Sequence, residues 1–357
     1  MTPEIVITVG LPGSGKSTLV KDLVAQGYFR VNRDEIGGTL TSPQAPIYQY
    51  LWRAYTQGGV RRFVIDNTYL IPEHRAVLLQ VAKELGLPVR VLWLKTTLEQ
   101  AQVFAARRQI QKLGRLLRPH EYKEAGKTDP GMFPPGVQYK FAKDGVPPTL
   151  AEGFVSIEEI EVETVWGPDY TNKAIILDLD GTVRTTDTGI PWPRKPEEVK
   201  LIPGRAAILK EWQEAGYLIL GATNQSGIDR SPKDPKYVSE ADVVACIQRT
   251  NDLLALNTPI DVLYSTDRGG PPQSFYRKPM PGMGVALIEK YKLCPSCCTF
   301  VGDMTTDKTF AERCGFQFQW DHHFFREKPV GGNIFESGNS SGAAKPRGLG
   351  RLAISRD

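Results

Sequence analysis

Short apolar runs alternate with longer amphipathic segments in two separate parts of the chain. In the first part, the apolar runs cover residues 4–9, 63–66 and 89–94. The segments with helical periodicity cover residues 16–25, 73–85 and 97–112. Buried strands that alternate with helices indicate a parallel sheet with helices on both faces.

The second part begins at Ala174 and shows the same alternation. Its predicted strands cover residues 174–180, 217–224, 261–265 and 299–303. Its predicted helices cover residues 205–215, 239–256 and 282–290. The two parts share an order of elements but no repeated sequence pattern, so we predict two α/β domains. Each is expected to be a parallel sheet in a three-layer arrangement.

The segments between these patterns predict the domain boundaries. Polar residues, Gly and Pro intervene between Glu161 and Asn172, which places the two domains at residues 1–163 and 164–327. Periodicity fails from Gly114 to Pro148, and we predict a lid over about residues 108–146, because long irregular segments in compact domains are usually functional. Residues 328–357 are too polar and glycine-rich to bury a core and are expected to be disordered.

Composition supports a globular chain of two domains. The chain has 357 residues, of which 41% are hydrophobic and 24% are charged. Its longest apolar runs are far shorter than the roughly 20 residues of a membrane span, so we expect no membrane association. No cleavable leader is visible, and the five cysteines are an odd number. These features predict a reducing compartment, the cytoplasm or, in a eukaryote, the nucleus.

Basic residues are concentrated in the first domain. Residues 1–150 carry 20 Lys and Arg against 12 Asp and Glu, and the excess is greatest over residues 107–127. Such a segment favours a polyanionic ligand, either nucleotide phosphates or a nucleic-acid backbone. A solvated helix face is the alternative interpretation.

The sequence GLPGSGKST follows the first predicted strand and opens the first predicted helix. It fits the P-loop pattern, in which glycines let backbone N–H groups converge on phosphate oxygens while the lysine reaches the outer phosphates. The serine after the lysine holds Mg²⁺ in this pattern. We therefore predict ATP binding, with Lys16 on the transferred phosphate and Ser17 on Mg²⁺. The residues expected to bind the nucleotide are Gly10, Gly13, Ser14, Gly15, Lys16, Ser17 and Thr18.

Asp34 lies just beyond a further predicted strand at residues 28–32, and Asp66 ends the predicted strand at residues 63–66. Both are expected near the sheet edge where α/β folds bind ligands. Asp34 can accept the proton of an attacking hydroxyl, as a kinase requires, or it can cap the helix that begins at Glu35. Asp66 is predicted to contact the acceptor or Mg²⁺, or to cap a helix. Arg107 and Arg108 stand at the start of the predicted lid, where a guanidinium can clamp the transferred phosphate.

The first domain resembles the kinase domain of polynucleotide kinase-phosphatases. VNRDEIGG, IDNT, TTLEQA and PPTLAEGF follow the P-loop in that order, and the resemblance covers about Ile5 to Glu159. It implies that Asp34 is the general base acting on a 5′-hydroxyl and that Arg108, or alternatively Arg107, is the lid arginine. The phage-type enzymes carry an acceptor-binding arginine where this chain has Gly37, so another residue must provide that contact.

A second site is predicted around DLDGT, at the end of the first strand of the second domain. Asp178 and Asp180 are two residues apart and therefore point the same way. In such a pair, one carboxylate can attack phosphorus while the other transfers protons. Because two close carboxylates repel each other, a bound cation is expected, and this implies Mg²⁺. Further polar residues stand at the ends of later elements, namely Thr223, Asn224, Arg277, Lys278, Asp303 and Asp307.

This ordered set resembles the haloacid dehalogenase phosphatase superfamily. The resemblance implies a Rossmannoid fold with Asp178 as nucleophile and Asp180 as general acid and base. Thr223, Asn224, Arg277 and Lys278 are then expected to bind the phosphoryl group or the substrate. Mg²⁺ is expected on Asp178, Asp180, Asp303 and Asp307. For Asp307, a helix-capping or surface role is the alternative.

Two branches of that superfamily compete. ATNQSGI and RKPMPGM resemble the same motifs in histidinol-phosphate and heptose-bisphosphate phosphatases. Members of that branch commonly carry a zinc-binding loop of Cys and His before the RKP segment. The corresponding segment of this chain, YSTDRGGPPQSFYRKP, contains no Cys and no His. DLDGTVRTTDTG and ATNQSGI also match the phosphatase domain of polynucleotide kinase-phosphatases. The short interval from Asp180 to Thr223 leaves room for a loop and one helix, so we expect a minimal cap and a site open to a polymer end. CPSCC at residues 294–298 lacks the further ligands of a tetrahedral zinc site.

Together these features predict an enzyme that acts on broken strands. It would phosphorylate 5′-hydroxyl ends with ATP and hydrolyse 3′-phosphate ends of DNA or RNA, so a ligase is an expected partner. One alternative is a small-molecule kinase fused to a metabolite phosphatase. Another is a non-catalytic, ATP-dependent protein that binds nucleic-acid ends. The sequence gives no indication of the oligomeric state.

Overall fold

The computed structural model describes residues 2–188, 190–326 and 351–354. These residues fall into two compact units. The first contains residues up to 105, residues 123–165 and the strand at 351–354, and the second contains residues 106–122 and 166–326. No helix in the described part of the chain is long and apolar enough to cross a membrane.

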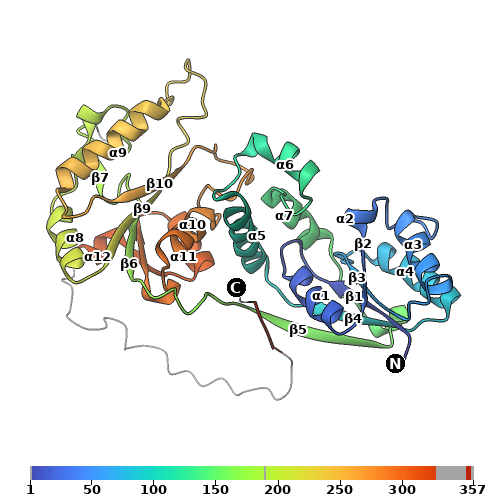
Figure 1. The fold of residues 1–357 in the computed structure, drawn as a ribbon. Coiled ribbons are helices and arrows are strands. Elements are labelled where there is room, and N and C mark those ends of the chain that lie inside the picture. Colours follow the sequence, from blue (N-terminus) through green and yellow to red (C-terminus); the bar gives the residue numbers. More distant parts are fainter. Residues whose placement is uncertain (1, 189, 327–350, 355–357) are drawn as a thin grey trace. The chain divides into compact units, whose positions relative to one another are not determined.

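The first unit is built on a six-stranded parallel sheet with the order β13-β5-β4-β1-β3-β2 (Figure 1). Its strands are β1 (Glu4–Val9), β2 (Phe29–Asn32), β3 (Arg62–Asp66), β4 (Val89–Leu94), β5 (Ser156–Thr164) and β13 (Arg351–Ile354). Its helices are α1 (Lys16–Ala25), α2 (Arg33–Ile36), α3 (Pro46–Thr56), α4 (Pro72–Leu85), α7 (Pro135–Asp144), the short η2 (Leu150–Glu152) and most of α6 (Tyr122–Thr128). The helix α5 (Leu98–Leu113) begins in this unit.

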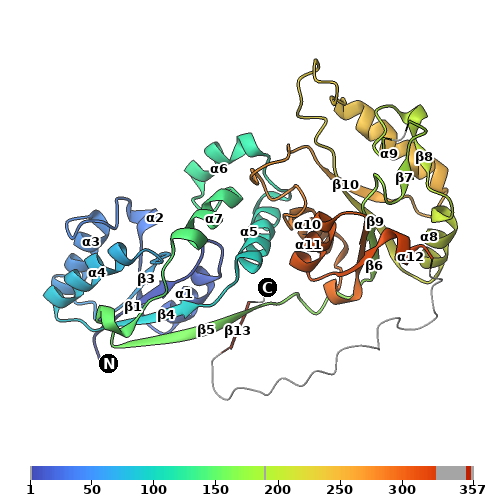
Figure 2. The ribbon, with the colours of Figure 1, turned by 180° about the vertical axis from the view of Figure 1, so that it is seen from behind.

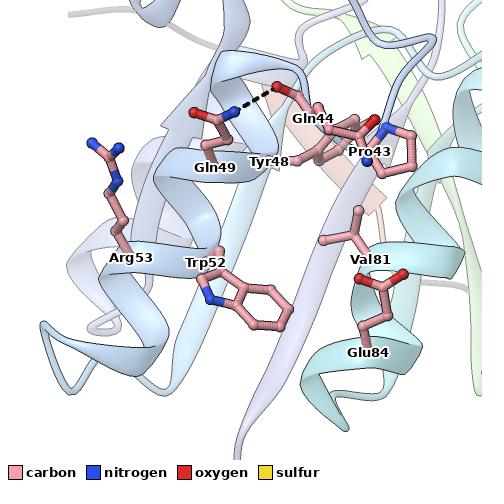
Figure 3. A pocket seen from close by; sticks show the side chains of 8 residues that line it. All are labelled: Pro43, Gln44, Tyr48, Gln49, Trp52, Arg53, Val81 and Glu84. Atoms are coloured by element: carbon pink, nitrogen blue, oxygen red, sulfur yellow. Dashed lines mark hydrogen bonds between the residues drawn. The ribbon is translucent and has the colours of Figure 1, made fainter.

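Helices α3 and α4 cover one face of this sheet (Figure 2). A hollow of about 210 Å³ opens beside them, with the partly exposed Trp52 at its rim (Figure 3). Gln49 donates a hydrogen bond to the backbone oxygen of Gln44 at 2.9 Å on one side of it. None of the residues predicted to bind phosphate lines this hollow.

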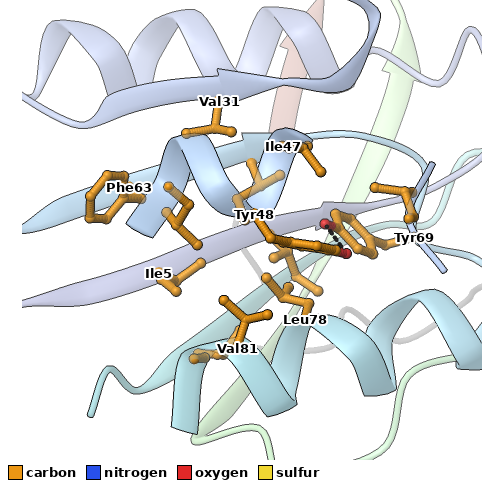
Figure 4. Close-up of a cluster of buried hydrophobic side chains, with 14 of the residues drawn as sticks. Ile5, Val31, Ile47, Tyr48, Phe63, Tyr69, Leu78 and Val81 are labelled. Carbon is orange, nitrogen blue, oxygen red and sulfur yellow. Dashed lines mark hydrogen bonds between the residues drawn. The ribbon is translucent and has the colours of Figure 1, made fainter. Parts of the chain in front are cut away.

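The core beneath α3 and α4 consists of branched apolar and aromatic side chains (Figure 4). Tyr48 and Tyr69 face one another within it, and their hydroxyl groups are 3.4 Å apart. Burial raises the pKa of both phenols, so they stay neutral. A second cluster, around Val20 and Leu23 of α1, covers the opposite face of the sheet. The predicted three layers are therefore present.

The second unit has a five-stranded parallel sheet with the order β10-β9-β6-β11-β12. Its strands are β6 (Ala174–Leu177), β9 (Leu218–Asn224), β10 (Asp261–Ser265), β11 (Thr299–Gly302) and β12 (Gln317–Trp320). Its helices are α8 (Arg205–Glu214), α9 (Glu240–Leu254), α10 (Gly282–Tyr291), α11 (Thr305–Cys314), α12 (Asp321–Phe324) and the short η1 (Pro119–Glu121), η3 (Pro196–Glu198) and η4 (Pro295–Cys297). Separate apolar clusters cover its two faces. The prediction of two parallel-sheet α/β domains is confirmed.

Only a small insertion follows β6. A two-stranded antiparallel sheet of β7 (Arg184–Thr185) and β8 (Lys200–Leu201), together with η3, precedes α8. The predicted loop and helix therefore also contain a short hairpin.

Three features differ from the sequence-based predictions. The segment from Gly114 to Pro148 contains α6 and α7, because Pro135 at the first turn of α7 favours helix initiation instead of preventing a helix. The boundary between the units lies after Val165, and residues 106–122 group with the second unit. Within the tail predicted to be disordered, residues 351–354 form β13, which pairs with the edge of β5. The rest of that tail lies outside the described residues.

Candidate active sites

The predicted P-loop lies between the end of β1 and the start of α1. Gly13 and Gly15 have φ values of +84° and +95°, a left-handed conformation that side chains rarely adopt. A Cβ on Gly10 would come within 2.8 Å of Ser14 Oγ. The glycines therefore allow the tight turn that points backbone N–H groups toward a bound phosphate.

The lysine of the P-loop is held against the loop. Lys16 Nζ donates hydrogen bonds to the backbone oxygens of Gly10 at 2.9 Å and Leu11 at 2.7 Å. Ser17 is exposed in the first turn of α1, where its hydroxyl can reach Mg²⁺. The structure thus brings together the residues predicted to contact the nucleotide.

An unpredicted glutamine anchors this loop. Gln138 on α7 is fully buried, and its Nε2 donates to the backbone oxygens of Pro12 at 2.9 Å and Ala101 at 2.8 Å. Thr96 Oγ1 adds a hydrogen bond to Ser14 O at 3.0 Å. Gln138 lies in the segment predicted to be an irregular lid, and its role depends on contacts that local sequence does not reveal.

Asp34 is exposed on the short helix α2. The cap of that helix is Asn32, whose side chain accepts a hydrogen bond from Asp34 N at 2.7 Å. The alternative that Asp34 itself caps a helix is therefore wrong. Its carboxylate pairs with the neighbouring Arg33 at 2.6 Å and remains about half exposed. An exposed carboxylate at the end of β2 can accept a proton from a bound hydroxyl.

Asp66 lies at the end of the adjacent strand β3 and is buried. Its Oδ2 accepts hydrogen bonds from Arg30 Nη2 at 2.8 Å and from Asn32 Nδ2 at 3.1 Å. These contacts replace the helix-capping role considered for Asp66. They fix Asn32, and through it Asp34, beside the carboxyl end of the sheet.

The two lid arginines have different surroundings. Arg107 is buried, its Nε lies 2.5 Å from Glu289 Oε1, and its guanidinium stacks 4.4 Å above the ring of Trp166. These contacts give Arg107 a structural role within the second unit. Arg108 is partly exposed on the same helix, so it stays the predicted lid arginine.

In the second unit, a lysine links two buried aspartates. Lys278 Nζ lies 2.8 Å from Asp178 Oδ1 and 2.8 Å from Asp307 Oδ1. Burial alone would lower the pKa of Lys278, but the two carboxylates outweigh it and raise the pKa above its usual value. Lys278 is therefore a permanent positive charge beside Asp178, where a phosphoryl group would bind.

Three carboxylates form a candidate Mg²⁺ site. One oxygen each from Asp178, Asp303 and Asp307 lies within 4.8 Å of the others. Burial, followed by the charges of Asp178 and Asp307, raises the pKa of Asp303 to about 6. Clustered carboxylate oxygens are the ligands that hard divalent cations prefer, so these residues fit Mg²⁺.

Asp307 forms an ion pair and also has the helix-capping role given above as its alternative, while its place on Mg²⁺ stays a prediction. Its Oδ1 pairs with Lys278, while its Oδ2 accepts a hydrogen bond from Met304 N at 3.1 Å and caps α11. A Cβ on Gly302 would run into this carboxylate, so only glycine fits there.

Asp180 faces different partners from the other carboxylates. Its Oδ1 lies 2.7 Å from Arg184 Nε, and its Oδ2 accepts a hydrogen bond from Gln225 Nε2 at 2.7 Å. The Asp180 carboxylate lies outside the cluster of Asp178, Asp303 and Asp307, and its role as a Mg²⁺ ligand stays a prediction. Arg184 and Gln225 were not singled out in the sequence, because nothing local shows that they contact Asp180.

The remaining predicted residues surround Lys278. Asn224 accepts a hydrogen bond from Lys278 N at 3.0 Å and donates one to Lys278 O at 3.2 Å, so it positions the lysine. Thr223 is fully buried at the end of β9, and its Oγ1 accepts from Gln225. Arg277 Nη1 donates to Asp267 O at 3.0 Å, and burial lowers the pKa of Arg277.

The eight residues predicted for this site line one cavity of about 530 Å³, namely Asp178, Asp180, Thr223, Asn224, Arg277, Lys278, Asp303 and Asp307. Its wall also contains the basic residues Arg230 and Lys236, together with the partly exposed Trp192 and Met304. The cavity therefore combines a carboxylate centre with basic and aromatic groups at its margin.

Comparison with known proteins identifies both domains. Residues 5–115 match the model of an AAA domain, and residues 173–325 match that of the polynucleotide kinase 3 phosphatase family. The chain therefore contains one segment similar to each of these two domains. The predicted resemblance to polynucleotide kinase-phosphatases is confirmed, and the cofactors of such a pair of domains are ATP and Mg²⁺.

Curated relatives of two kinds resemble the chain. A bifunctional polynucleotide phosphatase/kinase of Schizosaccharomyces pombe is 32% identical over 158 residues, which are 44% of this chain and 33% of that protein. The chain thus spans a third of that relative's length. A D-glycero-beta-D-manno-heptose-1,7-bisphosphate 7-phosphatase of Haemophilus influenzae is 32% identical over 38% of this chain and 73% of its own length.

Solved structures give two further similarities. A structure of the Pnkp1/Rnl/Hen1 RNA repair complex contains a chain that is 17% identical, with 89% of this chain and 96% of that chain covered and a TM-score of 0.30. D,D-heptose 1,7-bisphosphate phosphatase from B. bronchiseptica, complexed with magnesium and phosphate, is 27% identical over 41% of this chain and 78% of its own, with a TM-score of 0.36.

Proposed function

We propose that the chain repairs the ends of broken nucleic-acid strands. Its first domain transfers the γ-phosphate of ATP to a 5′-hydroxyl end, and its second domain hydrolyses a 3′-phosphate end. The observation that carries this proposal is the presence, in one chain, of a P-loop domain and a domain of the polynucleotide kinase 3 phosphatase family. The S. pombe relative is named for both activities.

In the kinase reaction, the loop N–H groups and Lys16 hold the phosphate oxygens of ATP. Asp34 accepts the proton of the 5′-hydroxyl as its oxygen attacks the γ-phosphorus. The contacts of Asp66 with Arg30 and Asn32 keep α2 in place for this step. We propose Arg108 as the lid residue that stabilises charge on the transferred group.

In the phosphatase reaction, a carboxylate oxygen of Asp178 attacks phosphorus and forms an aspartyl-phosphate. Asp180 gives a proton to the leaving 3′ oxygen and then takes one from the water that hydrolyses the intermediate. Lys278 and Thr223 hold the phosphoryl oxygens. Mg²⁺, when bound to Asp178, Asp303 and Asp307, neutralises charge on the phosphate.

The two activities prepare ends that a ligase can join, since ligation needs a 5′-phosphate and a 3′-hydroxyl. We therefore propose that a ligase acts after this chain. We also propose a reducing compartment, the cytoplasm or, in a eukaryote, the nucleus, because the chain has an odd number of cysteines, five.

A metabolite phosphatase is the second candidate, because a heptose-bisphosphate phosphatase is as identical to the matched part of this chain, at 32%, as the S. pombe relative is. Two features favour a polymer end. The segment from Tyr264 to Pro279 lacks the Cys and His of a zinc loop. The cavity also carries Arg230, Lys236 and Trp192 at its margin, which suit phosphates and bases beyond the reacting group.

The test uses purified protein, Mg²⁺, labelled ATP and oligonucleotides with a 5′-hydroxyl or a 3′-phosphate, as DNA and as RNA. We expect label transfer and phosphate release from the wild type. Lys16→Ala should abolish only label transfer, and Asp178→Ala should abolish only phosphate release. Heptose 1,7-bisphosphate serves as the competing substrate. If heptose 1,7-bisphosphate is hydrolysed at least about tenfold faster than any 3′-phosphate end, the second domain is a metabolite phosphatase and our proposal for it is wrong.

A further inference from the structure

Two accessible thiols stand at the ends of one tight turn in the second unit. Cys294 precedes η4, and Cys297 is its last residue. Cys297 is exposed and Cys294 is partly exposed, whereas Cys246, Cys298 and Cys314 are buried. Neither accessible cysteine belongs to the carboxylate site.

The turn places the two cysteines at a distance suitable for a disulfide. Cys297 N donates a hydrogen bond to Cys294 O at 2.9 Å, which closes a four-residue turn. The first and last Cα atoms of such a turn are less than about 7 Å apart. A disulfide needs a Cα separation of roughly 4.4–6.8 Å. The backbone can therefore accept a Cys294–Cys297 disulfide with little movement.

Hydrogen bonds hold this turn on the protein from both sides. Cys294 N donates to Asn172 O at 2.9 Å, and Gln317 N donates to Cys298 O at 3.0 Å. The side chain of Gln317, at the start of β12, donates to Ser296 O at 2.9 Å. Because the turn is fixed at both ends and in its middle, the two thiols stay close without further ordering.

The thiols are also not equivalent. Burial works against a Cys294 thiolate, but hydrogen bonds from Cys297 and Ser296 outweigh it and lower the pKa of Cys294. The hydrogen bond with Cys294 raises the pKa of Cys297. Cys298 points into the apolar core of the unit, and burial raises its pKa to about 12. Cys294 is therefore the best nucleophile of the three.

We propose that Cys294 and Cys297 form a redox-active dithiol that exchanges with small-molecule disulfides. The Cys294 thiolate attacks one sulfur of the disulfide and expels one thiolate, which takes up a proton. Cys297, as its thiolate, then attacks Cys294 Sγ and expels the second thiolate, which takes up the other proton. The protein loses two protons and two electrons, and the small disulfide is reduced to two thiols.

A metal site is the competing use of two thiols. A structural zinc site needs four ligands. Among the residues that the structure describes, the cluster of Asp178, Asp303 and Asp307 is the only group of three or more potential metal ligands, and it contains no cysteine. The pair is therefore better suited to form a disulfide than to hold a metal ion.

The experiment treats the folded full chain with oxidised glutathione, quenches with acid and locates the modified thiols by peptide mass spectrometry. In the wild type we expect a Cys294–Cys297 disulfide with the loss of two hydrogens. In Cys297→Ser we expect a persistent glutathione adduct on Cys294. In Cys294→Ser we expect modification at least about tenfold slower. Cys298→Ala is the matched control and should behave as the wild type.

Three results would overturn the proposal. The first is a folded wild type that forms no disulfide at residues 294–297. The second is a disulfide that joins Cys297 to Cys298 instead. The third is equal rates of adduct formation in Cys294→Ser and Cys297→Ser. Circular dichroism of each variant before treatment ensures that the rates compare folded proteins.

Discussion

Arg184 Nε lies 2.7 Å from Asp180 Oδ1, and the side chain of this arginine is only 1% exposed. The guanidinium is fixed in turn, because its Nη1 donates to Thr250 Oγ1 at 3.1 Å. Gln225 Nε2 holds the other oxygen of Asp180 at 2.7 Å. Both oxygens of the proposed acid and base are thus held in place, and a catalytic proton donor works only when its orientation is fixed.

Gln225→Ala should impair proton transfer by Asp180. We expect kcat for 3′-phosphate ends to fall about 10- to 100-fold, within the range that general acid catalysis contributes. p-Nitrophenyl phosphate should be affected several-fold less, because its leaving group needs no proton. Both substrates are compared by steady-state kinetics.

Gln213→Ala is the matched control for this variant. Gln213 is on α8 and donates to Thr258 O, so its substitution should leave kcat unchanged for both substrates. An equal fall of kcat for both substrates in Gln225→Ala would show that Gln225 acts through Thr223 and phosphate binding instead.

Lys278→Met should remove the charge that separates Asp178 from Asp307. Breaking a buried ion pair from one side costs about 3–5 kcal/mol, so the free energy of unfolding without Mg²⁺ should fall by about that amount. Phosphatase activity should be lost while kinase activity stays. Since the carboxylates then lack the charge of Lys278, Mg²⁺ should stabilise the variant more than the wild type, as measured by thermal unfolding with and without Mg²⁺.

Lys290→Met provides the comparison, because Lys290 forms an exposed pair with Asp261. Lys290→Met should lower the free energy of unfolding by less than about 1 kcal/mol. If Lys278→Met proved as stable as Lys290→Met in the absence of Mg²⁺, the proposed electrostatic role of Lys278 would be wrong.

The sequence was sufficient for features that depend on local pattern. Apolar runs and glycine positions are local, and β1, β4, β10 and α1 have the predicted bounds. The motif residues Asp178, Lys278 and Asp307 meet because parallel strands bring their carboxyl ends to one edge.

Features set by tertiary contacts could not be predicted. β5 has a charged sequence, but Ile160 and Val162 are buried against apolar residues of α1 and β4. The side-chain partners Gln138 and Gln225 contact residues distant in sequence. Arg107 and Arg108 are adjacent in the sequence, and only the contacts of Arg107 with Glu289 and Trp166 distinguish their roles.

Gln138→Ala should loosen the P-loop. One hydrogen bond from Gln138 Nε2 ends on Pro12 O in the loop and the other on Ala101 O of α5, and the loss of such a bond costs about 0.5–1.5 kcal/mol. We expect the Kd for ATP to rise about tenfold, measured by calorimetry, with phosphatase activity unchanged. Gln49→Ala, which removes an exposed hydrogen bond on α3, should leave ATP binding as it is. Unchanged ATP affinity in Gln138→Ala would contradict the anchoring role.

Asp34→Asn should separate chemistry from nucleotide binding. Its carboxylate is exposed, and the cap of α2 is formed by Asn32, so the substitution leaves the backbone contacts intact. We expect kcat of the kinase to fall about 10²- to 10⁴-fold, the contribution of a general base, while KM for ATP changes less than about twofold.

The adjacent carboxylate supplies the control for Asp34→Asn. Glu35 lies on the same helix and pairs with Arg30, so Glu35→Gln changes the local charge equally without touching the proposed base. Its kcat should stay within about threefold of the wild type, because an exposed pair contributes little. If both variants lost kcat to the same extent, the effect would come from the charge of α2, and Asp34 would not be the base.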